Sequence, residues 1–419
     1  MESLDILNYI SLVLGAIFVL CVAYQFVYIF VPFLKRGRKL TTKREYRYAV
    51  LIPARNEEKV LPHLISSIKG QTYPSELVDI FVIADNCTDN TAQAARDAGA
   101  FCVYERQNKT EIGKGYALDY ALNLIKEDYP DNDYQGYFVF DADNLLDENY
   151  IEEMNKMFSN GYRVLTSYRN TKNYGTSWVS AGNSLWYLRE SAYLNEPRTL
   201  LDTSCAISGT GFLVHREILE RFGGWKFFLL TEDIQFSIQQ VLDGEKIGYC
   251  GKAVLYDEQP VKFSQSWRQR MRWTKGSMQV TRNYFFKMIK GVFTGKGFAY
   301  FDLLCATMLP LIITIASGFL YAIMIILGLI FQINLNSVIA GILGLAVNSY
   351  FVLLSMGFIT MVSEWHKIFA PIHKKILYTF TFPIFMFTYI PITFVALFSK
   401  DVGWKPIVHD QVKTLDQVR

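Results

Sequence analysis

Two short acidic segments carry the residue types that group-transfer chemistry needs. Asp141 and Asp143 are separated by one alanine, and Thr231, Glu232 and Asp233 are consecutive. Carboxylate oxygens suit Mg²⁺ or Mn²⁺, and one or two of them suffice where phosphates and water complete the coordination shell. Asp141 and Asp143 are therefore candidate metal ligands. Asp233 is a candidate general base that would accept the proton of an attacking hydroxyl.

A simpler interpretation is available for each acidic segment. Two aspartates around one residue occur often by chance at the end of a strand. Asp233 stands near the start of a helix predicted over residues 232–242, where an acidic side chain is favoured as a cap and by the helix dipole. The two roles of Asp233 are compatible.

A third segment, Gln269-Arg270-Met271-Arg272-Trp273, combines two arginines with a tryptophan. Planar guanidinium groups suit phosphate oxygens, and the indole of Trp273 offers an apolar face on which a sugar ring can stack. The alternative is that the arginines pair with surface acids and that Trp273 anchors at a membrane interface. For Arg272, a role in supporting the site is equally open.

The elements that would position these residues alternate between strand and helix patterns, which predicts an α/β fold. Apolar strands are expected over residues 49–52, 78–84, 100–104 and 137–140, and helices over residues 57–69, 91–98 and 116–126. This alternation indicates a largely parallel sheet with helices on both faces. Ligands bind beyond the carboxyl ends of such strands.

Polar residues follow three of these strands at their carboxyl ends. They are Ala54-Arg55-Asn56-Glu57, Asp85-Asn86 and Asp141-Ala142-Asp143. Because the carboxyl ends of parallel strands meet at one edge, the three clusters predict a single site. Solvated loops are the alternative. Residues 178–193 predict a helix whose Trp186 and Tyr187 either pack in the core, the favoured interpretation, or line an acceptor groove.

Composition points to a globular middle held between membrane segments. Hydrophobic residues make up 51% of the 419 residues and charged residues only 19%, and the apolar excess lies near both ends. Residues 10–34 carry no charge and exceed the roughly 20 residues that cross a bilayer. Glu2 and Asp5 precede this run and a basic cluster at residues 35–39 follows it, so a retained anchor is expected rather than a cleaved signal peptide. By the positive-inside rule the middle region faces the cytoplasm.

Three further apolar spans are expected over residues 303–331, 338–362 and 376–398. A simple count places the C-terminus outside the cell, whereas a re-entrant segment would leave the tail with Trp404-Lys405-Pro406 in the cytoplasm. Residues 274–298 mix basic and aromatic side chains, which favours a helix in the interface plane over a surface helix of the globular domain. The expected divisions are residues 1–40 (anchor), 41–273 (catalytic domain), 274–300 (interfacial helices), 301–400 (spans) and 401–419 (tail).

Other classes of function are disfavoured by the same composition. A net charge of +3 without a basic stripe argues against a nucleic-acid partner. The five histidines lack metal-site spacing, and the six cysteines contain no C-x-x-C pair and are read as reduced thiols.

Taken in order along the chain, the motifs at residues 53–57, 85, 114–115, 141–143, 231–233 and 269–273 resemble those of the family 2 membrane glycosyltransferases. This family includes the cellulose, chitin, hyaluronan and poly-N-acetylglucosamine synthases. The resemblance covers roughly residues 48–273, and the last motif fits the family pattern Q-x-x-R-W at every fixed position. It implies a GT-A fold on the cytoplasmic side of the plasma membrane, in a multi-pass protein, and an inverting transfer from a UDP-sugar.

The resemblance also implies a role for each matched residue. Asp141 and Asp143 would lie at the diphosphate and its Mg²⁺ or Mn²⁺, and Asp233, within Thr231-Glu232-Asp233, would be the base. Residues expected to contact the uridine or the nucleotide are Ala54, Arg55, Glu57, Asp85 and Lys114. Those expected to hold the diphosphate or the acceptor are Gln269, Arg270, Arg272 and Trp273, with Cys205 and Gly209 in an acceptor-side loop over residues 205–211.

Some features depart from the family pattern. Asn86 follows Asp85 where many relatives carry a second aspartate, and residues 205–211 lack the Phe-Phe-Cys-Gly form of cellulose synthases. The leading hypothesis is a UDP-glucose- or UDP-N-acetylglucosamine-dependent enzyme that extends a surface polysaccharide. A single transfer to a lipid acceptor is the alternative, and a non-catalytic sensor of nucleotide sugars is disfavoured because it would need no base.

Overall fold

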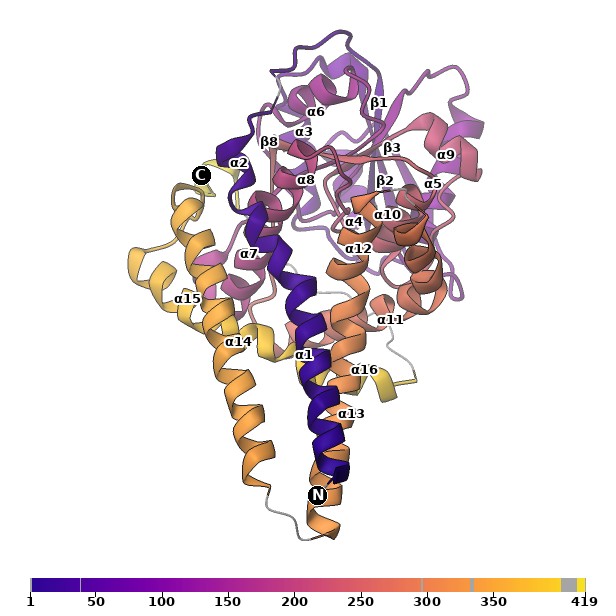
Figure 1. Cartoon of the computed structure of the whole chain (residues 1–419). Helices are drawn as coiled ribbons and strands as arrows, with labels where there is room; N and C mark the ends of the chain where they lie inside the picture. Colours follow the sequence, from indigo (N-terminus) through magenta and orange to yellow (C-terminus); the bar gives the residue numbers. More distant parts are fainter. Residues whose placement is uncertain (1, 38, 295–296, 332–334, 401–412, 419) are drawn as a thin grey trace.

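The computed structural model describes the chain except for residues 1, 38, 295–296, 332–334, 401–412 and 419, and it shows a sheet domain from which long helices project (Figure 1). The predicted tail residues Trp404, Lys405 and Pro406 lie outside the described residues. The predicted α/β fold with flanking apolar helices is confirmed.

The described residues form one eight-stranded sheet with the order β3-β2-β1-β4-β7-β6-β8-β5. Strands β3, β2, β1 and β4 are parallel, as are β6 and β8, whereas β7 and β5 run antiparallel to their neighbours. The strands are β1 (Tyr48–Ala54), β2 (Val78–Asp85), β3 (Cys102–Arg106), β4 (Gly136–Val139), β5 (Leu145–Leu146), β6 (Val164–Thr171), β7 (Phe212–His215) and β8 (Ile247–Asp257).

Helices cover both faces of the sheet because successive residues of a strand point to opposite faces. In β1, Val50 and Ile52 belong to one apolar core, whereas Ala49 and Leu51 belong to the other. The helices of this domain are α3 (Leu61–Lys69), α4 (Thr91–Asp97), α5 (Lys114–Asp128), α6 (Tyr150–Phe158), α7 (Trp178–Glu190), α8 (Glu196–Leu200), α9 (Arg216–Phe222) and α10 (Glu232–Leu242).

The reversed direction of β7 positions a loop that matters for the site. Because β7 is antiparallel to β4, residues 208–211, which precede β7, lie beside the residues that follow β4. Gly211 N donates to Val139 O at 3.0 Å, and Asp141 N donates to Thr210 Oγ1 at 2.8 Å. A fully parallel sheet would have kept these two segments at opposite edges.

Four stretches of the described chain are long and apolar enough to cross a membrane: Tyr9–Leu34, Phe298–Ile330, Val338–Ser363 and Ile372–Phe398. They agree closely with the expected spans. The helices concerned are α1 (Glu2–Tyr28), α2 (Val31–Leu34), α12 (Phe298–Leu303), α13 (Leu309–Ile330), α14 (Asn336–Ser363), α15 (Ile372–Phe387) and α16 (Tyr389–Phe398).

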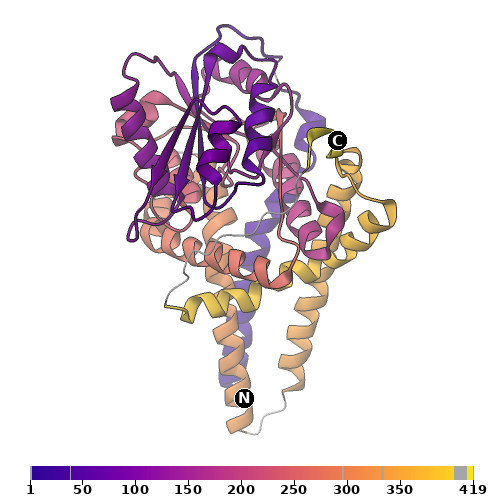
Figure 2. The same ribbon diagram turned by 180° about the vertical axis from the view of Figure 1, so that it is seen from behind.

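The fourth stretch differs from the other three in its orientation. Helices α1, α13 and α14 project away from the sheet domain, whereas α15 and α16 run across beneath it, with α16 beside α11 (Phe263–Phe293) (Figure 2). The stretch is interrupted at Thr388, between Pro383 and Pro391. Proline removes a backbone donor and disfavours a continuous helix, which accounts for the break.

Helix α11 runs through position 273 without a break, so the expected boundary between catalytic domain and interfacial helices falls inside one helix. At the other end of the chain, Val418 packs with Leu145 and Tyr256, and Lys413 Nζ donates to Lys172 O at 2.6 Å. The C-terminal segment therefore rests on the sheet domain. This placement favours the re-entrant alternative over a C-terminus on the far side.

Candidate active site

A cavity of about 830 Å³ opens at the carboxyl edge of the sheet and continues between the apolar helices. Three strand ends contribute the polar residues that the sequence analysis grouped together. Ala54, Arg55 and Glu57 follow or end β1, Asp85 ends β2, and Asp141 and Asp143 follow β4. The expectation that these clusters share one edge agrees with the geometry, while their individual roles remain predictions.

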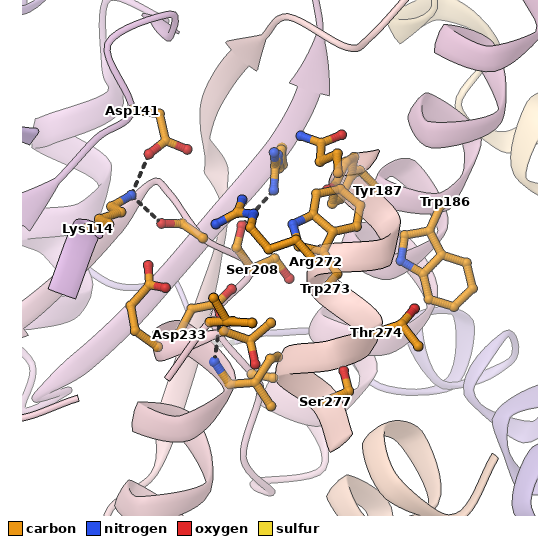
Figure 3. Close-up of a pocket in the computed structure, with 18 of the residues that line it drawn as sticks. Lys114, Asp141, Trp186, Tyr187, Ser208, Asp233, Arg272, Trp273, Thr274 and Ser277 are labelled. Carbon is orange, nitrogen blue, oxygen red and sulfur yellow. Dashed lines mark hydrogen bonds and ion pairs between the residues drawn. The ribbon is translucent and has the colours of Figure 1, made fainter. Parts of the chain in front are cut away.

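Lys114, at the start of α5, links the strand edge to the loop before β7. Its ammonium group donates to Asp141 Oδ1 at 2.5 Å and to the carbonyl of Gly209 at 2.7 Å (Figure 3). The carboxylate of Asp141 is 40% exposed and faces the cavity. The pair therefore presents one positive and one negative group side by side at the wall of the cavity.

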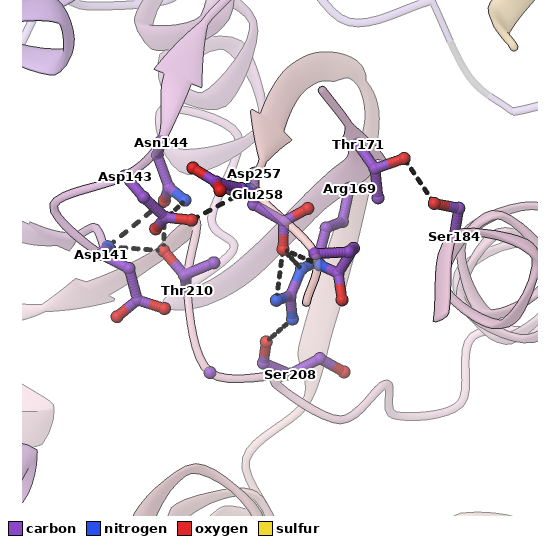
Figure 4. Close-up of polar contacts among 12 residues, drawn as sticks. Asp141, Asp143, Asn144, Arg169, Thr171, Ser184, Ser208, Thr210, Asp257 and Glu258 are labelled. Atoms are coloured by element: carbon purple, nitrogen blue, oxygen red, sulfur yellow. Dashed lines mark hydrogen bonds and ion pairs between the residues drawn. The ribbon is translucent and has the colours of Figure 1, made fainter. Parts of the chain in front are cut away.

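Asp143 is held more deeply than Asp141. It is only 5% exposed, and its Oδ2 accepts a hydrogen bond from the backbone N–H of Glu258 at 2.9 Å (Figure 4). The neighbouring Asn144 accepts from Thr210 Oγ1 at 2.5 Å. This network joins the turn after β4 to the end of β8 and to the loop before β7, so the two aspartates are presented by a rigid frame.

At the end of β2, Asp85 is buried and accepts a hydrogen bond from Arg106 Nη1 at 2.8 Å. Arg106, at the end of β3, was not singled out from the sequence. Asn86 adopts a left-handed conformation with φ 53°, a region in which asparagine is enriched, and its side chain accepts from the N–H of Asn108 at 2.9 Å. Asn86, which stands where many relatives carry a second aspartate, therefore serves as a turn residue in this chain.

Thr231, Glu232 and Asp233 line the cavity at the start of α10. Asp233 Oδ1 accepts from the backbone N–H of Ile234 at 2.8 Å, so the carboxylate also serves the first turn of the helix. Burial, and then the charge of Asp233, raises the pKa of Glu232 to about 7. Burial also raises the pKa of Asp233, which the Ile234 N–H and the positive charges of Lys114 and Arg272 oppose.

One face of α11 closes the cavity opposite the strand edge. The residues of α11 that line it each have another lining residue three or four positions away, as neighbours on a helix surface do; they are Gln265, Arg268, Gln269, Met271, Arg272, Trp273, Thr274 and Ser277. Helix α11 approaches α10 closely at Gly276, where a Cβ would lie 2.6 Å from Thr231 Cγ2. The absence of a side chain at position 276 therefore sets the separation between Asp233 and the arginine and tryptophan of α11.

Two of the predicted substrate-binding residues do not line the cavity. Arg270 is fully buried and donates to Thr388 Oγ1 at 2.6 Å and to Phe385 O at 3.2 Å, contacts that hold its side chain against α15 and α16 instead of in the cavity. It satisfies polar groups at the break between α15 and α16. Cys205 is likewise fully buried, and burial raises the pKa of its thiol to about 12.

Several cavity residues have no counterpart among the predictions. Arg169, on β6, donates from Nε to Asp257 Oδ2 at 2.7 Å and from Nη1 to Ser208 O at 2.6 Å (Figure 4), and its guanidinium stacks 3.7 Å from the Tyr187 ring centroid. Glu190 accepts from Ser208 Oγ at 2.6 Å, and burial raises its pKa. These residues come from separate elements, so no local spacing marks them as a group.

Trp186 and Tyr187 both line the cavity, which favours the groove interpretation over core packing alone. Trp186 lies across the cavity from Lys114 and Asp141, with Trp273 between them (Figure 3). Beyond Trp186 the wall is formed by the apolar helices. We call this part the membrane arm; its wall includes Leu194, Leu303, Ala306, Thr307, Pro310, Leu311, Thr314, Met386, Tyr389 and Thr393.

Comparison with known proteins adds independent information. Residues 46–276 match the family described as Glycosyltransferase like family 2. The chain is 25% identical over 264 residues to a probable glycosyltransferase of Bacillus subtilis, YdaM, with 58% of each chain covered. It is 26% identical over 251 residues to a beta-monoglucosyldiacylglycerol synthase of Nostoc, covering 58% of this chain and 51% of that protein. It is 25% identical over 271 residues to a poly-beta-1,6-N-acetyl-D-glucosamine synthase of Staphylococcus epidermidis, covering 63% of each.

These alignments span between about half and two thirds of the relatives' own lengths. Among solved structures, a mannosyltransferase from Pyrobaculum calidifontis in complex with GDP-Man and Mn²⁺ covers 94% of this chain and 100% of its own, with a TM-score of 0.59 and 17% identity. At that identity the likeness concerns the fold. The family match extends over more than half of the chain, and the protein belongs to the family 2 glycosyltransferases.

Proposed function

We propose that this enzyme transfers a sugar, with inversion, from a UDP-sugar to a hydroxyl or phosphate oxygen of an acceptor that reaches the site from the membrane. UDP-glucose and UDP-N-acetylglucosamine are the proposed donors. Asp233 acts as the base, and Asp141 and Asp143 hold Mg²⁺ or Mn²⁺. The acceptor favoured by the geometry is a lipid that receives a single sugar.

The observation that carries this proposal is the continuity of one cavity from the strand edge to the membrane arm. The strand-edge end presents Arg55, Asp85, Lys114 and Asp141, whereas the membrane arm presents Ala306, Pro310 and Leu311 among its apolar walls. A polar nucleotide fits the first environment and a lipid chain the second. The two reactants would then meet beside Asp233.

The residues of the chain divide the chemistry between them. The acceptor oxygen attacks the anomeric carbon as the bond from that carbon to the diphosphate oxygen breaks. Asp233 takes the proton of the attacking oxygen where that oxygen carries one, a contribution typically worth about 10²–10⁴-fold in rate. Lys114 and Arg272 face the same cavity and favour the charged form of Asp233. Their positive charges also oppose the negative charge that develops on the departing diphosphate.

The metal ligands fit a divalent cation by their donor chemistry. Both aspartates line the cavity with carboxylate oxygens, the ligands that Mg²⁺ and Mn²⁺ prefer, and a nucleotide diphosphate with water can supply the remaining positions. When bound, the cation neutralises negative charge on the diphosphate. The Mn²⁺ of the Pyrobaculum mannosyltransferase complex supports the same assignment.

A second function is favoured by a different observation. Trp273, Trp186 and Tyr187 line the middle of the cavity, and aromatic faces suit the stacking of successive sugars. This arrangement, together with the similarity to poly-beta-1,6-N-acetyl-D-glucosamine synthases, supports repeated transfer that extends a polysaccharide. The Nostoc relative, which is a synthase of beta-monoglucosyldiacylglycerol, supports the lipid acceptor instead.

The proposed location is the plasma membrane, with the sheet domain in the cytoplasm. The basic cluster at residues 35–39 lies between α2 and the sheet domain, where the positive-inside rule expects cytoplasmic charge. The contact of Val418 with Leu145 and Tyr256 supports a C-terminal segment on the same side. Helices α1, α13 and α14 would cross the bilayer, and α11, α15 and α16 would lie near its inner surface.

UDP release by the purified protein in lipid nanodiscs tests the proposal. A panel of UDP- and GDP-sugars is supplied with Mg²⁺, Mn²⁺ or EDTA, and labelled products are sized. Metal-dependent release from one UDP-sugar with a small lipid-soluble product is the expected result. A high-molecular-weight product would favour the polysaccharide synthase, and release from a GDP-sugar alone would overturn the donor class. Undiminished release in EDTA would remove the metal from the proposal.

A further inference from the structure

Arg189, at the end of α7, lies where the cavity passes from the sheet domain to the membrane arm. Its guanidinium is 7% exposed and donates to Gln25 Oε1 of α1 at 2.6 Å. Gln25 belongs to the apolar stretch Tyr9–Leu34, near the end closest to the sheet domain. Arg189 is therefore a buried cation beside the end of a candidate membrane span that is nearest the sheet domain.

The charge of Arg189 is not balanced by an acid. Within the part of the chain that the structure describes, no carboxylate forms an ion pair with it, and its hydrogen bond goes to a neutral amide. Its neighbour on the helix, Glu190, accepts instead from Ser208. Burial and the positive charge of Arg198 lower the pKa of Arg189 to about 10, and the nearby charge of Glu190 opposes this shift without forming an ion pair, so the side chain stays protonated at neutral pH.

Arg198, a second buried arginine that lines the cavity, is paired with a carboxylate, as buried charges usually are. Arg198 donates to both oxygens of Asp302, at 2.7 and 2.8 Å, and Tyr24 and Tyr28 donate to the same carboxylate at 2.6 and 2.8 Å. That pair is neutral as a unit. A buried charge without such a partner is costly. Among the described residues Arg270 also forms no ion pair, but it lies outside the cavity and donates to Thr388 and Phe385, whereas Arg189 lines the cavity.

The position of Arg189 points to a ligand rather than to a packing role. It lines the same cavity as Asp233, and its Cζ lies 5.4 Å from the ring centroid of Trp186, which faces that cavity (Figure 3). The apolar residues of the membrane arm, Leu194 among them, line the same cavity as Arg189. An anionic group with an apolar tail matches a cation that is followed by an apolar passage.

We propose that the membrane arm binds the phosphate headgroup of an anionic lipid acceptor, with Arg189 as its counter-ion. This inference rests on the proposed lipid acceptor and narrows it from lipids in general to lipid phosphates. A guanidinium group matches phosphate oxygens with two parallel donors, and Arg189 would gain there the anionic partner that the described residues do not supply. A neutral acceptor would leave its charge uncompensated.

Binding is measured on the full-length protein in detergent with EDTA and without nucleotide, by calorimetric titration. Farnesyl phosphate and farnesol form a pair that differs only in the phosphate, and inorganic phosphate tests the headgroup alone. We expect farnesyl phosphate to bind at least about tenfold more tightly than farnesol, as a charge-assisted contact allows. Arg189→Gln should abolish this preference, and Arg189→Lys should keep part of it.

The matched control is Arg282→Gln, which removes an exposed arginine of α11 outside the cavity and should leave the preference unchanged. Equal binding of farnesyl phosphate and farnesol to the wild type, or a preference that survives Arg189→Gln, overturns the inference. Inorganic phosphate that binds as tightly as farnesyl phosphate would identify a free-anion site and overturn the lipid source. If Arg189→Gln fails to fold, the wild-type comparison and Arg189→Lys still decide.

The inference and the proposed function fail in different ways. Asp233→Asn should bind farnesyl phosphate as the wild type does, because Asp233 is not part of the headgroup contact. Asp233-dependent transfer to a neutral lipid, with no preference for the phosphate, would refute the inference and leave the proposed function standing. Phosphate-dependent binding without any sugar transfer would support the inference and refute the proposed function.

Discussion

The two ends of the cavity treat charge differently. At the strand edge, Lys114 pairs with Asp141 and Arg106 with Asp85. In the membrane arm, Arg198 pairs with Asp302, whereas Arg189 donates to the neutral Gln25 and forms no ion pair with any described residue. The strand edge therefore has its charges arranged before any ligand binds, while the membrane arm keeps one cation uncompensated. A ligand at the strand edge would therefore meet charges that are already paired, whereas a ligand in the membrane arm would meet the unpaired cation of Arg189.

The ends also differ in how they are built. The strand edge comes from loops that follow neighbouring strands of one sheet, which holds them in register. The membrane arm is assembled from α1, α7, the stretch from α12 to α13, and the pair α15 and α16, which are far apart in sequence. The positions of side chains at the strand edge are set by short loops after neighbouring strands. The positions of side chains in the membrane arm are set by how helices distant in sequence pack together.

The largest effect is expected where both ends meet, at Asp233. With an acceptor that attacks through a hydroxyl group, Asp233→Asn should lower kcat by about 10²–10⁴-fold because the amide cannot accept the hydroxyl proton, while UDP-sugar affinity changes little. Steady-state kinetics and calorimetric UDP binding provide the two measurements.

Glu232→Gln is the matched control for Asp233→Asn. The neighbouring acid also lines the cavity but is assigned no proton transfer, so the loss should stay below about tenfold, less than a general base contributes. Equal losses in the two variants would show that the carboxylates work as a unit and that the base is misassigned.

The second effect contrasts the paired and unpaired arginines. Asp302→Asn leaves Arg198 without its carboxylate and should destabilise the protein by about 3–5 kcal/mol, the usual result of breaking a buried pair. Arg189→Gln removes a charge that forms no ion pair with a carboxylate in the described part of the chain, and it should leave stability unchanged or raise it. Thermal denaturation of both variants in the same detergent makes the comparison. A large loss for Arg189→Gln would mean that its charge is compensated in the protein.

The third effect concerns the close packing of α10 against α11 at Gly276, which sets the separation between Asp233 and Arg272. Gly276→Ala introduces a methyl that would lie 2.6 Å from Thr231 Cγ2, so α10 and α11 must move apart. Overpacking of this kind costs roughly 1–3 kcal/mol. Turnover should fall more than UDP affinity, because Asp233 moves relative to Arg272. Gly344→Ala is the control, since a Cβ there meets nothing within 4 Å, and similar kinetics in the two variants would contradict the prediction.

The smallest effect is expected in the pH dependence. A base must be ionised, and burial raises the pKa of Asp233 above that of an ordinary aspartate. Turnover should therefore fall as the pH is lowered, and the midpoint should lie above about 3.9, the pKa of an unperturbed aspartate. The group titrating near 7 is expected to be Glu232, so Glu232→Gln should remove a step in that range. A profile of kcat/KM against pH that is flat down to pH 4 would exclude a raised pKa for the base.

The strand edge could be predicted closely from the sequence because its residues follow a local rule. An apolar run ends, a polar cluster begins, and parallel neighbours bring such ends together. The predictions for Arg270 and Cys205 failed on position because a motif names residues without their directions. Arg270 belongs to the same five-residue segment as Gln269 and Trp273, yet it serves the break between α15 and α16.

Arg169, Asp257 and Glu190 were missed for a related reason. Arg169 meets Asp257 only because β6 and β8 are neighbours in the sheet, and Glu190 meets Ser208 only because α7 ends beside the loop before β7. Residues separated by 88 and 18 positions carry no shared spacing that periodicity could detect.

The sequence by itself determined the class of this protein. Alternating apolar and polar segments specified the α/β fold, long uncharged stretches specified the apolar helices, and the ordered motifs specified the family. Only the tertiary structure decided that α15 and α16 lie across beneath the sheet domain, that Arg270 lies outside the cavity, and that no acid of the described chain forms an ion pair with Arg189. The physical reason is that hydrophobic periodicity reports burial along one element, whereas the balance of buried charge depends on contacts between elements.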